Sequence, residues 1–238
     1  MGDTAVGYPG DSQEAMEQLE AFTLGTPAIV CRWRLAGSEL PLAKRHLRAL
    51  AARMVQGKKI PHALVAWAHQ HIEWTLSAGS AEQPDGVLML VVDDEGRAAM
   101  SCGPYVPLRK QTKRSLAQRA VTARKEAEEL GVAPETLWIR RGEGLVAGIG
   151  TGEQPSASCG LVLDLASTLG IPVSRSANMA EPIAQGVGEY DEVFLVSDEH
   201  GIVPARDAMG DMATRLEGSY NRLLDRTREQ SSHHRVQH

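Results

Sequence analysis

The chain has 238 residues, a formal net charge of −5, 42% hydrophobic residues and 23% charged residues. This length suits one large domain or two small ones, and the composition is that of an ordinary globular protein. The negative net charge gives no electrostatic basis for binding nucleic acid, and no apolar run approaches the roughly 20 residues that a membrane helix needs.

The start of the chain and its cysteines point to a cytoplasmic protein. Residues 1–14 contain Gly, Asp and Ser, are predicted to be mobile, and do not lead into the apolar core of a secretory signal. Cys31, Cys102 and Cys159 are odd in number and widely spaced. We therefore expect reduced thiols, and neither a disulfide framework nor a zinc site.

The first part of the chain alternates between strand and helix signals. Leu47, Leu50 and Met54 fall on one face of a predicted helix, and a proline suits the first turn of the next. In chain order, the predicted elements are a strand at 28–35, a helix at 42–55, a helix beginning at Pro61, and a strand at 87–92 that enters a hairpin through the turn at 93–96.

The basic linker at 109–114 marks the predicted boundary between two domains, at 1–108 and 109–226, and the polar residues 227–238 predict a disordered tail. The predicted elements after the linker are a helix from Lys113 that ends at the C-cap Gly131, strands at 137–139 and 145–147, a helix over 162–169 ended by Gly170, strands at 192–196 and 202–205, and a last helix at 212–226.

Several short segments follow one another in a characteristic order. They are Trp33–Gly37, His46–Leu50, the helix from Lys113 to Ala123-Arg-Lys-Glu-Ala127, Leu163–Val173, Asp191–Leu195 and Thr214–Leu216. In order and spacing, over about residues 30–222, they resemble class IV aminotransferases, the pyridoxal phosphate (PLP) enzymes of fold type IV. The resemblance implies a two-domain α/β (α+β) fold of the D-amino-acid aminotransferase-like type, and a homodimer.

The resemblance also implies where a cofactor ring would be held. Lys113 falls at the position of the lysine that forms the internal aldimine. Gly148 falls near the glutamate that contacts the pyridine nitrogen, so this chain lacks that carboxylate. Ala49 replaces the phosphate-binding arginine of the family, and Leu116 replaces an asparagine. Lys113 has a second interpretation, as one cation of a solvated basic cluster in the 109–114 linker.

Around the cofactor phosphate the resemblance implies Ser156, Ser158, Ser197 and Asp198. An aspartate there would repel a phosphate dianion. The two earlier serines precede a helix and need no function beyond capping it, although a helix start also suits an anion. Cys159, in the same turn, is either a nucleophile with a lowered pKa or a packed thiol.

Three functions remain open from the sequence. The leading hypothesis is an enzyme that binds no PLP and acts on a small acidic or amino-acid-like substrate between the domains. The second is a PLP-dependent aminotransferase, or a lyase of the aminodeoxychorismate type, with Lys113 as aldimine lysine. The third is a non-catalytic binding protein on the same fold. We expect no metal, because His69 and His71 point to different sides of their helix.

Overall fold

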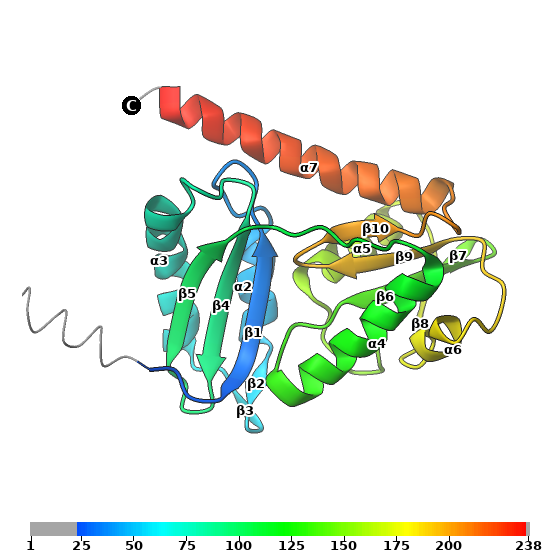
Figure 1. Ribbon diagram of the computed structural model, residues 1–238, viewed down its shortest axis with the longest axis horizontal. Helices are drawn as coiled ribbons and strands as arrows, with labels where there is room; N and C mark the ends of the chain where they lie inside the picture. The colour runs from blue at the N-terminus through cyan, green and yellow to red at the C-terminus, as the bar shows by residue number, and fades with distance from the viewer. Residues whose placement is uncertain (1–22, 237–238) are drawn as a thin grey trace, which may run out of the picture.

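The structure is a computed structural model that describes the backbone of residues 23–236 and side chains as far as Ser232. The predicted mobile segment 1–14 lies outside these residues. Two β-sheets lie side by side, one in residues 27–103 (the N-terminal half) and one within residues 113–236 (the C-terminal half) (Figure 1). They fall on either side of the predicted domain boundary. None of the helices described here combines the length and the apolar character needed to span a membrane.

The first sheet is antiparallel, with strand order β1-β4-β5. Its strands are β1 (Pro27–Arg34), β4 (Val87–Asp93) and β5 (Ala98–Gly103). One face packs against the helices α2 (Ala43–Ala51) and α3 (His62–Gly79), where Trp33, Leu90 and Ile72 belong to a common core. Because successive side chains of a strand point to opposite faces, Arg32 and Arg34 lie on the other face of β1.

The helix that we predicted to reach residue 55 ends at Ala51, and this prediction was wrong at its C-terminal end. A short antiparallel hairpin forms instead, with two residues in each strand, Met54–Val55 (β2) and Lys58–Lys59 (β3). Its turn residues, Gln56 and Gly57, have φ angles of 49° and 75°. Two positive φ angles in succession are typical of the type I′ turn that closes such hairpins.

The second sheet has strand order β10-β9-β6-β7-β8, and all its pairings are antiparallel except β7–β8. Its strands are β6 (Thr136–Arg141), β7 (Gly144–Ala147), β8 (Val173–Arg175), β9 (Val193–Ser197) and β10 (Gly201–Pro204), and its helices are α4 (Lys113–Leu130), α5 (Ala157–Thr168), α6 (Ala180–Ala184) and α7 (Asp211–Val236).

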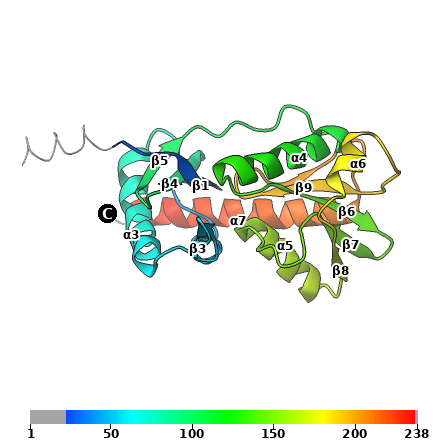
Figure 2. The ribbon, with the colours of Figure 1, turned by 90° about the horizontal axis from the view of Figure 1, so that it is seen from below.

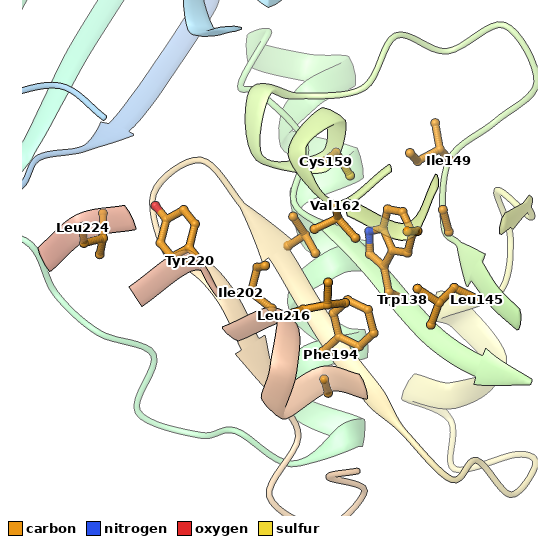
Figure 3. Close-up of a cluster of buried hydrophobic side chains, with 14 of the residues drawn as sticks. Trp138, Leu145, Ile149, Cys159, Val162, Phe194, Ile202, Leu216, Tyr220 and Leu224 are labelled. Carbon is orange, nitrogen blue, oxygen red and sulfur yellow. The ribbon is translucent and has the colours of Figure 1, made fainter. Parts of the chain in front are cut away.

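Both faces of this sheet are covered. Leu195 packs with α4 and α6, whereas Phe194 packs with α5 and α7 around Trp138 (Figure 3). Both faces of β9 are buried, so neither face needs polar side chains. This explains why Val193–Val196 form a continuous apolar run.

Helix α7 continues to Val236, so the predicted disordered tail is wrong for residues 227–236. The helix crosses from the second sheet to the first (Figures 1 and 2). Arg228 Nε lies 2.7 Å from Asp85 Oδ1, and Ser231 Oγ donates to the carbonyl of Gly37 at 2.5 Å. These contacts with the N-terminal half explain why a polar stretch remains helical.

Candidate functional site

The candidate site lies where the two halves meet. A cavity of about 70 Å³ is lined by Trp33 and His46 from the N-terminal half and by Pro134, Ser156 and Asp198 from the C-terminal half. The start of α5 and the turn after β9 therefore converge on α2. These are segments in which the sequence predicted phosphate-binding residues.

Ser156 is the N-cap of α5, because its Oγ accepts the backbone N–H of Cys159 at 3.3 Å. Ser158, in the first turn, donates its backbone N–H to Asp198 Oδ1 at 2.7 Å. The first N–H groups of a helix have no intrahelical partner, so an oxygen ligand is expected there. In this chain the carboxylate of Asp198 takes that position.

The second oxygen of Asp198 faces His46. Oδ2 lies 3.5 Å from His46 Nδ1, and the two side chains are 6% and 3% exposed. Burial alone would raise the pKa of Asp198, but His46 and the backbone N–H of Ser158 outweigh it and hold the pKa below its ordinary value. Asp198 is therefore a buried carboxylate that stays ionised at neutral pH. The sequence indicated only that His46 packs at a helix start.

The other two residues predicted at the cofactor have contacts of their own. Ser197 Oγ accepts the backbone N–H groups of Glu199 and His200, at 3.1 and 3.2 Å, and so folds the turn between β9 and β10. Gly148 packs so tightly that a Cβ there would lie 2.8 Å from the carbonyl oxygen of Leu137. A larger residue at position 148 would have to displace that strand.

Lys113 lies away from this cavity. It is the first residue of α4, and its backbone N–H donates to Asp207 Oδ1 at 2.6 Å. An 18-residue helix is about 27 Å long. The opposite end of α4 leads through Gly131 to Pro134 in the cavity wall. The structure therefore brings Ser156, Ser158 and Asp198 together but places Lys113 at the other end of α4 from the segment that reaches the cavity.

A cluster that the sequence did not reveal lies on the other face of β1 and consists of Arg34, Tyr105 and His200. The guanidinium carbon of Arg34 is 3.3 Å from the ring centroid of Tyr105, and that ring is 5.7 Å from His200. Within the described residues, Arg34 has no carboxylate partner within 4 Å, and neither Arg34 Nε nor His200 Nδ1 has a hydrogen-bond partner. Burial lowers the pKa of His200 and so favours its neutral form. An alternating strand carrying Arg32 and Arg34 was the only signal for this cluster.

Cys159 is a packed thiol. It is fully buried in the core between the second sheet, α5 and α7 (Figure 3). Burial raises its pKa to about 11, so the thiol is protonated at neutral pH. Of the two interpretations offered by the sequence, the structure favours packing over nucleophilic catalysis.

Comparison with known proteins gives structural matches only. No protein-family description matches the sequence, and no curated protein matches it. A crystal structure of a candidate 4-amino-4-deoxychorismate lyase from Legionella pneumophila is similar, with a TM-score of 0.55 and 13% identity over 87% of this chain and 96% of that chain.

Two further structures agree. The T.th. branched-chain amino acid aminotransferase, complexed with N-(5'-phosphopyridoxyl)-L-glutamate, has a TM-score of 0.54 at 13% identity, over 87% of this chain and 90% of that chain. A hypothetical aminotransferase from Mycobacterium tuberculosis, in its apo form, has a TM-score of 0.51 at 15% identity, over 84% of this chain and 88% of that chain. Despite this low identity, the chain has the fold of class IV aminotransferases and aminodeoxychorismate lyases, as the sequence predicted.

Proposed function

We propose that this protein is a diverged class IV aminotransferase-like enzyme that acts on a small acidic or amino-acid-like molecule without PLP. The observation that carries the proposal is the separation between Lys113 and the cavity at Asp198. A lysine side chain is much shorter than the roughly 27 Å of α4. An aldimine at Lys113 and a phosphate at the start of α5 would therefore belong to two different places.

The dimensions and charge of the cavity support the same proposal. Cofactor pockets usually enclose about 300–1,000 Å³, whereas this cavity has about 70 Å³. Its wall carries the ionised carboxylate of Asp198, which would repel a phosphate dianion in a site of low dielectric. Ala49 supplies no cation to offset that charge, and Arg53, which also lines the cavity, donates its Nη2 to the carbonyl of Gly131 at 2.6 Å. We infer that these residues do not fit PLP as its phosphate and aldehyde would require.

The acidic character of the ligand is inferred from Arg34. Its guanidinium is half-buried against Tyr105 and is not neutralised by a carboxylate of the described residues. Arginine presents several donors in a planar fork, which suits a carboxylate group. The neighbouring Arg32 has its own partner, Glu199, at 3.6 Å. Of the two arginines on this face of β1, Arg34 is therefore the one with capacity for an external anion.

Lysine mapping tests the cofactor part of the proposal, since the phosphopyridoxyl ligand of the similar aminotransferase favours the PLP-dependent alternative. The protein is incubated with PLP, reduced with borohydride and digested, and the modified lysines are located by mass spectrometry. We expect sub-stoichiometric labelling spread over exposed lysines, equal in Lys113→Ala and in the same-helix control Lys125→Ala. Stoichiometric labelling that Lys113→Ala alone abolishes would establish the second hypothesis, a PLP-dependent aminotransferase or lyase.

Carboxylate binding tests the ligand part. We expect small carboxylates, such as glutamate and pyruvate, to raise the melting temperature of the wild type and of Arg32→Ala, but not of Arg34→Ala. Equal responses in both variants would contradict the role of Arg34. A bound carboxylate that is never converted would favour the third hypothesis, a non-catalytic binding protein.

A further inference from the structure

Asp198 is held as a bound anion would be held. Its Oδ1 accepts the Ser158 N–H at 2.7 Å in the first turn of α5, a helix of 12 residues. Helix starts bind phosphate, sulfate and carboxylate groups because their N–H groups and the helix dipole favour negative charge. Here the anion comes from the chain itself, from the turn that follows β9.

Two further polar groups point at the same carboxylate. Ser158 Oγ and His46 Nδ1 are buried and have no hydrogen-bond partner within the described residues, and the two residues are 1% and 3% exposed. His46 Nδ1 nevertheless lies 3.5 Å from Asp198 Oδ2. Buried polar atoms are seldom left without partners. Together with the Ser158 N–H, they surround the place that one anionic group occupies.

We propose that Ser158 and His46 form an anion-binding site that Asp198 occupies as an internal ligand, and that the site accepts inorganic phosphate once this carboxylate is removed. The inference rests on the proposed function. It adds to that proposal a physical reason why a phosphate-bearing cofactor is excluded from this site. An external anion must displace a buried, ionised side chain that is covalently tethered beside the site, and it must overcome the repulsion between like charges.

An entry path to the site exists. A groove of about 340 Å³ runs between α2 and α5, and its lining includes Arg45, Arg48 and Ser156. Ala49 and Ser156 line both this groove and the small cavity at Asp198. The groove therefore adjoins the site. Arg45 is paired with Asp164, which also lines the groove, at 2.7 Å, so Arg48 is the arginine of the groove that favours the approach of an anion.

The test measures phosphate affinity by isothermal titration calorimetry, with inorganic phosphate as the probe. Asp198→Ala empties the site, and Asp198→Ser retains a hydroxyl for the Ser158 N–H in case the alanine variant does not fold. We expect either variant to bind phosphate at least tenfold more tightly than the wild type. Asp225→Ala is the control, because it removes a surface carboxylate that pairs with Arg228 and lines neither the groove nor the cavity.

Three outcomes would overturn the inference: no gain in folded Asp198→Ser, an equal gain in Asp225→Ala, or a gain that persists when His46→Gln is added to Asp198→Ser. Inorganic phosphate has no aldehyde and cannot form an aldimine. Its binding therefore reports on the site alone, whereas borohydride mapping of the wild type reports on Lys113, so a failure of one proposal can be distinguished from a failure of the other.

Discussion

The buried pair of His46 and Asp198 makes a quantitative prediction about stability. His46 Nδ1 lies 3.5 Å from Asp198 Oδ2, and both side chains are almost fully buried. Removal of one partner leaves the other buried without its polar neighbour. Each single substitution is therefore expected to lower the free energy of unfolding by about 1–3 kcal/mol.

The assay is a double-mutant cycle of wild type, His46→Gln, Asp198→Asn and the double variant, unfolded in urea at pH 7. We expect a coupling energy of about 1–3 kcal/mol. The matched control is the surface pair of Arg45 and Asp164, which are 2.7 Å apart but 29% and 65% exposed. Solvent screens the charges of that exposed pair, so its coupling energy is expected to stay below about 1 kcal/mol.

The change of stability with pH gives a second test of this pair, and its direction follows from the pKa of Asp198. The pKa of Asp198 is lower in the folded protein than its ordinary value, so the unfolded chain binds the proton more readily. The stability that Asp198 contributes is present above about pH 4 and is lost as the pH falls through the native pKa. Asp198→Asn should lack this part of the acid-induced loss. A coupling energy indistinguishable from zero, or an unchanged acid profile in Asp198→Asn, would refute the reasoning.

Three further predictions concern packing and assembly. Gly201→Ala should lower the unfolding free energy by about 2–5 kcal/mol in urea titrations, because φ is +71° and the new Cβ would lie 2.2 Å from a buried tyrosine ring; Gly142→Ala, with φ of +57° and no neighbour within 4 Å, should cost only about 1–2 kcal/mol. Iodoacetamide should label Cys102 in the native state, whereas the buried Cys31 and Cys159 should react only after unfolding, as mass spectrometry would show. We also propose a homodimer, and a monomer mass by light scattering at micromolar concentrations would contradict it.

Local signals predicted most of the elements. Gly131 ends α4 with a φ angle of 63°, as its C-cap position in the sequence indicated. The glycine has a tertiary role too, because its carbonyl accepts the N–H of Val30 at 2.9 Å and a Cβ there would lie 1.7 Å from the carbonyl oxygen of Ala28. Where a local preference and a tertiary contact agree in this way, sequence analysis succeeds.

The errors arise where distant contacts or turns decide the structure. Met54 fits the apolar spacing of a helix, yet the turn at Gln56 and Gly57 directs it into a hairpin. The polar end of α7 has no apolar stripe to predict a helix, and it depends on Asp85 and Gly37 in the other half of the chain.

The candidate site could be predicted only in part. The sequence identified Ser156, Ser158 and Asp198 because the family resemblance drew attention to them. It could not pair Asp198 with His46, or place Arg34 against Tyr105, because each pair joins segments that only the folded chain brings together. Nor did the spacing that matched Lys113 to the family show that α4 would carry it away from the cavity.

The contacts of α7 also impose an order on biogenesis. The hydrogen bond from Ser231 to Gly37 joins residues 194 positions apart, so it can form only after the ribosome has added Ser231. Until then the first sheet has its own contacts and earlier ones such as the bond from the Val30 N–H to the carbonyl of Gly131. A nascent chain that stops before Arg228 would leave the loop at Gly37 and Asp85 uncovered. This exposed loop is the part of the N-terminal half whose cover is synthesised last among the contacts described here.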